Sequence, residues 1–237
     1  FFSYSTTNPG TCDDSFGTRW PPSTSSDTSL GAGSTPVPFA RSLTGLSPGT
    51  TYYYCALARN SYGTNFGTVQ TFTTSAALPT VSTNTAINLT GTTADLRGTS
   101  NPDGAATSGW FRYATTSPGS CNDTFGTRAP TTGGNALGSG TSSVSFAESI
   151  GGLSPATTYF YCAIAENAVG KVFGAVVSFT TPTPPTVTTA AASNLTNTSA
   201  RLNGTGNPNG STSTGWFRFS LTDPITCNDT FGSRAPT

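Results

Sequence analysis

The sequence predicts an all-β protein made of tandem β-sandwiches, and three observations support this fold class. One passage occurs three times, as FSYSTTNPGTCDDSFGTRWP (residues 2–21), FRYATTSPGSCNDTFGTRAP (111–130) and FRFSLTDPITCNDTFGSRAP (217–236). The repeat is about 107 residues long, which is the size of one small domain. Stretches rich in Val, Thr, Tyr and Phe alternate with turn signals such as NPDG (101–104). No segment has a convincing helical periodicity.

The phase of the repeat divides the chain into three predicted domains. Residues 1–75 form a partial copy with the late strands, residues 79–181 a complete copy, and residues 185–237 a partial copy with the early strands. The linker TPTPPT (181–186) is expected to be a stiff, extended spacer because it is rich in proline. The corresponding linker SAALP (75–79) is expected to be less stiff.

The complete copy is expected to contain a series of short strands, with a further short strand around its early cysteine. They are placed at residues 80–83, 93–98, 109–115, 143–149, 157–166 and 172–180. Alternation along the fifth strand predicts that its core-facing side chains are Tyr159, Tyr161, Ala163 and Ala165. The opposite face is then expected to carry Phe160, Cys162 and Ile164.

The cysteines recur in a fixed pattern, with one early and one late cysteine in each copy that reaches that far. A zinc site would need clustered ligands, and the chain has neither a C-x-x-C motif nor a histidine. We therefore predict two disulfides, Cys12–Cys55 and Cys121–Cys162, and an oxidising, extracellular setting. Cys227, the early cysteine of the third copy, is expected to pair with a residue beyond the end of this chain.

Two recurring motifs resemble those of fibronectin type III domains. The pattern L-x-P-x-T-x-Y, followed by an alternating strand and A-x-N, occurs at residues 46–60 and again at 153–167. The stretch T-x-A-x-L-x-G-T-x-N-P-x-G (92–104) resembles the second strand and following turn of bacterial members. The resemblance implies immunoglobulin-like, fibronectin type III-like sandwiches in which Tyr52 and Tyr159 are tyrosine corners bonded to nearby backbone. Two departures are the longer repeat and the added disulfide.

The loop motif C-x-D-x-F-G-x-R is the first candidate for a binding surface. In the complete copy it supplies Asp123 and Arg128, an acid and a base that could grip a polar ligand or a sugar. The alternative is a loop ordered by its disulfide, an aromatic plug and a local ion pair, which fits a motif present in every copy. Exposed ion pairs of this kind are common and contribute little energy.

The sequence W-F-R, which precedes that loop, is the second candidate. Trp110 and Arg112 alternate with core-facing aromatics and are expected on the outside, as are Trp216 and Arg218 in the third copy. Such a surface could stack on a sugar or on a neighbouring subunit. The alternative is that the tryptophan covers the disulfide on its own sheet.

Composition argues against several functional classes. The chain has no histidine and one lysine, Lys171, and its acidic residues form no pair of the glycosidase kind, so no catalytic residues are expected. No cofactor and no metal site are expected either. Net charge is zero and charged residues make up 8%, which argues against a nucleic-acid partner. No apolar run approaches the ~20 residues of a membrane span, so no membrane insertion is expected.

The predicted function is structural. We expect a component of an extracellular fibre, filament or cell-surface stalk, with cohesion or adhesion through other copies of the protein or neighbouring repeats. Two alternatives stay open: a non-catalytic linker array of a secreted multidomain hydrolase, and an adhesin that binds glycans. Residues 216–237 duplicate the first residues of the chain. Strand donation between chains would not carry that surplus, so the sequence favours a longer, continuous polypeptide of which this is a part.

Overall fold

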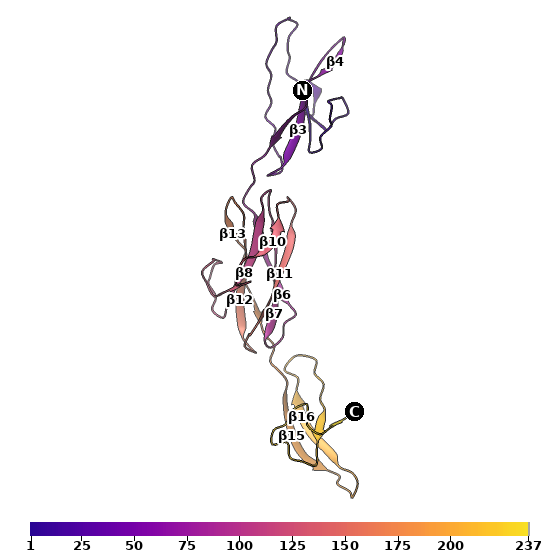
Figure 1. The fold of residues 1–237 in the computed structure, drawn as a ribbon, viewed down its shortest axis with the longest axis vertical. Helices are drawn as coiled ribbons and strands as arrows, with labels where there is room; N and C mark the ends of the chain where they lie inside the picture. The colour runs from indigo at the N-terminus through magenta and orange to yellow at the C-terminus, as the bar shows by residue number, and fades with distance from the viewer. Residues whose placement is uncertain (237) are drawn as a thin grey trace.

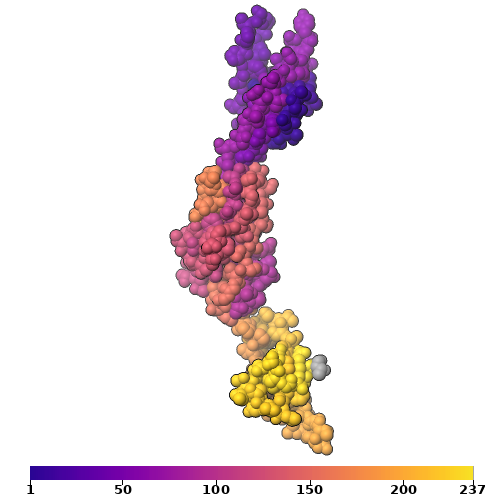
Figure 2. All heavy atoms as spheres, viewed as in Figure 1, coloured from indigo at the N-terminus to yellow at the C-terminus, as the bar shows by residue number. Residues whose placement is uncertain are grey.

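The protein is represented by a computed structural model, in which residues 1–236 are placed well enough to describe. Regular structure in this range is almost entirely β, with one short 3-10 helix, η1 (Thr24–Ser26), so the predicted all-β sandwich class is confirmed. Figure 1 shows a head segment (residues 1–75), a central segment (79–181) and a tail segment (185–236) following one another along one long axis. The molecule is narrower between these segments than within them (Figure 2). No helix in the described range is long and apolar enough to cross a membrane.

The central segment is a sandwich of two antiparallel sheets. Its strands are β6 (Thr80–Ile87), β7 (Thr93–Asn101), β8 (Thr107–Ala114), β9 (Thr127–Ala129), β10 (Asn135–Gly138), β11 (Val144–Gly151), β12 (Thr158–Glu166), β13 (Lys171–Phe173) and β14 (Val177–Thr180). One sheet has the order β11-β7-β6. The other has the order β10-β8-β12-β13, with β9 paired to β8 and β14 paired to β12.

The two sheets of the central segment enclose one hydrophobic core. Its members come from both sheets and include Leu96 and Phe146 from the first and Phe111, Tyr161 and Ala163 from the second. The rings of Phe111 and Phe146 lie 4.9 Å apart. Small residues leave room for them: a Cβ added at Gly98 or Gly109 would come within 2.9 Å of the Phe146 ring.

The predicted division of β12 into two faces agrees with the packing. Tyr159, Tyr161 and Ala163 belong to the core between the sheets. Cys162 and Ile164 belong to a second cluster on the outer face of the larger sheet. The sandwich therefore has a second apolar layer outside its core, and the disulfide loop lies over it.

The structure differs from the expected strands at two places. The strand expected at residues 172–180 is two strands, β13 and β14, which pair with different halves of β12. The break falls at Gly174, whose N–H donates to the Ala163 carbonyl at 2.8 Å, while the Ala163 N–H donates to Thr83 Oγ1 of the opposite sheet. The short strand expected around the early cysteine is β9, which begins several residues after Cys121. A further edge strand, β10, was not expected.

The head and tail segments each contain part of the same arrangement. The head strands are β1 (Phe2–Ser5), β2 (Thr18–Trp20), β3 (Thr51–Asn60), β4 (Gly63–Phe66) and β5 (Gln70–Thr73), in one sheet of order β2-β1-β3-β4 with β5 on β3. The tail strands are β15 (Thr186–Ser193), β16 (Arg201–Asn207), β17 (Phe217–Phe219) and β18 (Ser233–Ala235), in sheets β15-β16 and β17-β18. That the three segments are separate domains stays a prediction.

Candidate functional site

The repeated disulfide loop is the most elaborate feature of the surface. The bonds Cys12–Cys55 and Cys121–Cys162 are both present, and each ties the loop to the long strand β3 or β12. Cys55 and Cys162 are completely buried. Cys227, in the tail copy of the loop, is a free and exposed thiol with no partner among residues 1–236.

Asp123 is the polar centre of the central loop. It accepts hydrogen bonds from Trp110 Nε1 at 2.9 Å and Arg112 Nε at 3.1 Å on β8, and from Lys171 Nζ at 2.7 Å on β13. Burial raises the pKa of this carboxyl, but the hydrogen bonds from Lys171, Trp110 and Arg112 outweigh it, so the net pKa is below its ordinary value. The hydrogen bond to Asp123 raises the pKa of Lys171. One carboxylate therefore fastens the loop to two strands.

Trp110 lies on the outer face of its sheet, as expected, but beneath this loop and only 3% exposed, so it does not form an open contact surface. Its indole packs in the outer cluster with Cys162 and Ile164. The Arg128 guanidinium lies over the ring, 4.6 Å from its centroid, and Lys171 Nζ is 5.1 Å away. The tryptophan thus covers the disulfide, as in the alternative that the sequence left open.

Arg128 does not pair with Asp123. It donates instead to the carbonyl oxygen of Pro130 at 2.6 Å and to that of Gly133. Asp123 instead forms ion pairs with Arg112 and Lys171, which come from strands on either side of β12. An Asp–Arg grip on an external ligand would need both groups free, and here both are used within the protein.

The asparagine and glycine of the loop motif set the backbone conformation of the loop. Asn122 Oδ1 accepts from the Thr124 N–H at 3.0 Å, the Thr124 hydroxyl at 2.8 Å and the Phe125 N–H at 3.0 Å, which closes a turn. Gly126 has φ +51°, and a Cβ there would collide with the Tyr113 carbonyl oxygen. The same collision applies to Gly17 and Gly232, so each copy needs glycine after its loop phenylalanine.

The tail copy repeats the central contacts in a more exposed form. Asp229 accepts from Trp216 Nε1 at 2.9 Å and from Arg218, and Arg234 lies 4.9 Å from the Trp216 ring centroid. The hydrogen bond from Trp216 lowers the pKa of Asp229. Trp216 is 40% exposed, so it is the tryptophan of this motif that reaches the surface.

The head copy keeps the stacking and changes the polar groups. Phe1 stands where the central segment has Trp110, and Arg19 lies 4.1 Å from its ring centroid. Ser3 stands in place of Arg112, and Arg19 pairs with Asp27 at 2.6 Å. An arginine over an aromatic ring is therefore common to all three copies, while the carboxylate-centred network is not.

The tyrosines expected at the corners make the expected contact. The Ser47 N–H donates to the Tyr52 hydroxyl at 3.0 Å, and the Ser154 N–H donates to the Tyr159 hydroxyl at 2.9 Å. A third tyrosine was missed by the sequence reasoning. The Tyr161 hydroxyl donates to the Asn84 carbonyl of β6, next to a bulge in the β6–β7 pairing, and burial raises the pKa of Tyr161 to about 12.

The junctions between the segments are not equivalent. Between head and central segments, the Ala77 N–H donates to the Asp103 carbonyl at 3.0 Å. Gly49 and Gly104 meet there so closely that a Cβ on either would come within 3 Å of the other's backbone. At the second junction the position of Gly49 is taken by Ala156, with φ +52°, and Gly210, the copy of Gly104, has nothing within 4 Å.

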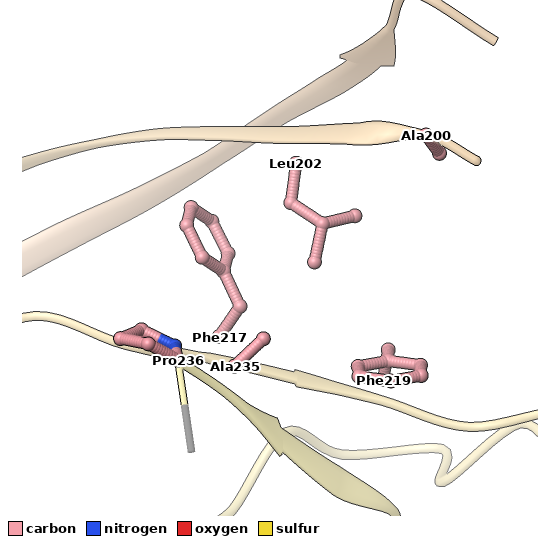
Figure 3. A pocket seen from close by; sticks show the side chains of 6 residues that line it. All are labelled: Ala200, Leu202, Phe217, Phe219, Ala235 and Pro236. Carbon is pink, nitrogen blue, oxygen red and sulfur yellow. The ribbon is translucent and has the colours of Figure 1, made fainter.

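The described residues contain no group of three or more His, Cys, Asp or Glu side chains able to hold a metal ion. Two hollows in the described residues are open and lined mainly by apolar side chains. A groove of about 550 Å³ lies on the head sheet and is lined by Phe2, Tyr4, Phe39, Tyr54 and Phe72, among others. A second, of about 450 Å³, lies between the two tail sheets, where Leu202 points toward Phe217 (Figure 3). Neither brings together groups able to perform acid–base chemistry.

Comparison with known proteins gives no family assignment. No family model and no curated protein matches the chain. Among solved structures, it is similar to the sensor domain of the anti-sigma factor RsgI4 of Pseudobacteroides cellulosolvens. A longer form is 20% identical over 44% of this chain and 88% of that one, with a TM-score of 0.26. A shorter form is 19% identical over 45% and 97%, with a TM-score of 0.30.

The FN1–FN3 domains of chicken CNTN1 are 17% identical to this chain, over 58% of it and 44% of that chain, with a TM-score of 0.30. At such TM-scores none of these likenesses carries an argument about function. The assignment of a β-sandwich rests on the sheets and core of the central segment.

Proposed function

We propose that this chain is a structural, non-enzymatic component of an extracellular fibre, filament or surface stalk. The observation that carries the proposal is the internal use of the loop motif. Asp123 and Arg128, the pair best suited to grip a ligand, are bonded to the protein's own tryptophan, arginine, lysine and carbonyl groups. A repeated motif whose charged side chains are bonded within the protein supports a role in stabilising the fold rather than in binding a ligand.

The arrangement of the segments supports a mechanical role. They follow one another along a line (Figure 1), and the disulfide of the central segment joins its loop to the central strand of the larger sheet. Closing a loop of this size stabilises a domain by roughly 3–4 kcal/mol in the chain-entropy model. Disulfides persist in oxidising surroundings, which supports an extracellular location. The proposed partners are neighbouring repeats and other copies of the protein.

Localisation in the organism that makes the protein tests this proposal. Antibodies raised against residues 1–237 should label extracellular fibres or stalks along their length in immunogold electron microscopy. Labelling confined to the cytoplasm, or to a secreted hydrolase without fibres, would contradict it.

Binding and activity assays separate the proposal from its alternatives. The purified chain should show no hydrolysis of polysaccharides, esters or peptides, and no saturable signal on a glycan array. Saturable glycan binding that is lost in a Trp216→Ala variant would favour the adhesin instead, because Trp216 is the exposed tryptophan of the loop motif.

A further inference from the structure

The LSPGT turn of the head (residues 46–50) meets the NPDG turn of the central segment (residues 101–104). A Cβ on Gly49 would lie 2.4 Å from the Gly104 carbonyl oxygen, and a Cβ on Gly104 would lie 2.6 Å from the Gly49 Cα. Both glycines have a positive φ, +54° at Gly49 and +90° at Gly104. Two bare backbones therefore pack directly against each other, which only glycine permits at both positions.

The N–H groups of these two glycines are bonded within their own segments. The Gly49 N–H donates to the Ser75 carbonyl at 3.1 Å, and the Gly104 N–H donates to the Gly140 carbonyl at 3.1 Å. The contact therefore leaves neither of these donors unpaired, which would be costly in a closed junction. Each turn is held in shape by its own segment, and this favours docking without rearrangement.

The linker between the two turns is hydrogen-bonded to the central segment. The Asn167 side chain, 8% exposed at the tip of the β12–β13 hairpin, donates to the Ala77 carbonyl at 2.8 Å, and the Ala77 N–H donates to the Asp103 carbonyl at 3.0 Å. Leu78 lies against the same tip, since a Cβ on Gly170 would come within 2.9 Å of Leu78 Cδ2. Both backbone polar groups of Ala77 are thus fixed, although the sequence predicted that this linker would be the less stiff of the two.

Asn167 is itself fixed by the hairpin that carries it. Its Oδ1 accepts from the Val169 N–H at 2.9 Å and from the Gly170 N–H at 3.2 Å. Its Nδ2 also donates to the Pro102 carbonyl of the NPDG turn at 3.2 Å. One side chain therefore connects the hairpin tip, the NPDG turn and the linker.

The corresponding turn of the central segment cannot make the same contact. In LSPAT (residues 153–157) Ala156 replaces Gly49 at nearly the same φ, +52°. Its Cβ takes the direction along which Gly49 approaches Gly104. The linker that follows, PTPP (residues 182–185), has one residue able to donate a backbone hydrogen bond, Thr183. Ala156 also shows that the fold accepts alanine in this turn, so the glycine at position 49 is required by the contact and not by the fold.

We propose that the LSPGT turn of the head is a docking surface for the NPDG turn of the segment that follows it, and that Asn167 holds the joint through Ala77. The first junction is then set by contact, whereas the second is set by its proline-rich linker. This rests on the proposed structural function, in which neighbouring repeats are partners, and it names the residues that fix one segment to the next. Glycine or alanine at one position of the turn decides which kind of joint follows.

Double electron–electron resonance across the first junction tests this docking. Nitroxide labels are attached at Thr71→Cys on β5 and Ser82→Cys on β6, which are exposed strand positions. The 237-residue chain carries Cys227→Ser, and peptide mapping confirms both native disulfides. This labelled parent chain should give one narrow distance distribution. Gly49→Ala should widen the distribution roughly twofold, because relative motion of linked domains is expected once a small interface is lost.

Gly45→Ala is the matched control for Gly49→Ala. Gly45 has φ +75°, but a Cβ there would have nothing within 4 Å, so the distribution should stay narrow. Both substitutions place alanine in a left-handed conformation, so the two variants should have similar melting temperatures. Asn167→Asp is an independent test, since it keeps the acceptor for Val169 and Gly170 and removes the donor to Ala77. It should also widen the distribution.

Four results would each overturn the docking: a broad distribution in the labelled parent chain, a Gly49→Ala distribution no wider than that of Gly45→Ala, an Asn167→Asp distribution as narrow as that of the parent, or a head segment that unfolds in Gly49→Ala alone. A broad junction in a protein that labels extracellular fibres would leave the structural function standing. A narrow junction in a protein confined to the cytoplasm would support the docking and contradict that function.

Discussion

Removing the Asp123 carboxylate should destabilise the central segment much more than removing its copy in the head. Asp123 accepts three hydrogen bonds from Trp110, Arg112 and Lys171, and its side chain is 24% exposed. A hydrogen bond to a charged group contributes about 1.5–3 kcal/mol when buried and less near solvent. We therefore expect Asp123→Ala to cost about 2 kcal/mol of unfolding free energy and Asp123→Asn about half of that.

Asp14 is the matched control for this substitution. It occupies the same place in the loop motif, but the tryptophan and arginine positions beside it hold Phe1 and Ser3. Asp14→Ala should therefore change stability by less than about 0.5 kcal/mol. Urea unfolding is followed by fluorescence in two single-tryptophan backgrounds, one that keeps Trp110 and one that keeps Trp20. Equal losses at the two sites would refute the argument that the network holds the loop.

The contribution of Asp123 to the free energy of unfolding should depend on pH in a definite direction. The pKa of Asp123 is lowered in the folded protein, so its contribution is fully present above the unfolded value of about 3.9. It is lost as the pH falls through the lower, folded pKa. The stability difference between the unaltered chain and Asp123→Asn should therefore be constant near pH 7 and shrink below about pH 4. A difference that peaks in acid would contradict this assignment.

Three further substitutions have clear expected effects. Tyr159→Phe and Tyr161→Phe should each cost about 1–3 kcal/mol in urea unfolding, since each hydroxyl has a backbone partner; a negligible cost at Tyr161 would remove its role at the β6 bulge. Gly126→Ala should lower the melting temperature more than Gly133→Ala, because only Gly126 faces the Tyr113 carbonyl. Ala156→Gly should stabilise the central segment by about 0.5–1 kcal/mol by relieving a left-handed alanine, and a loss would contradict that.

The fold was predictable because local patterns determine most of it. The alternation of large and small residues along β12 predicted both its faces correctly. The break between β13 and β14 was not predictable, because it depends on Thr83 of the other sheet accepting from the Ala163 N–H. β10 was missed because its residues lie in a glycine-rich stretch, and its only strong signal is the single buried residue Leu137.

The sequence predicted the disulfide loop and its motif, but not the residues that pair with Asp123. The repeated motif located Asp123 and the disulfide, and sequence proximity suggested Arg128 as the partner of Asp123. The actual partners, Arg112 and Lys171, lie on strands that only the sheet order brings together. Trp110 was expected outside because alternation points it away from the core. Alternation alone does not show that a disulfide loop closes over that outer face.

Single-molecule force extension of the 237-residue chain, held at its two ends, tests the central claim most directly. The Cys121–Cys162 bond encloses a separation of 41 residues, so reduction should lengthen the unfolding step of the central segment by ~140 Å at ~3.5 Å per residue. If the chain is a structural array, resolved unfolding steps should appear with the disulfides oxidised and with them reduced, and the central step should gain this length after reduction. Extension without any resolved unfolding step, or a central step of unchanged length after reduction, would contradict the account.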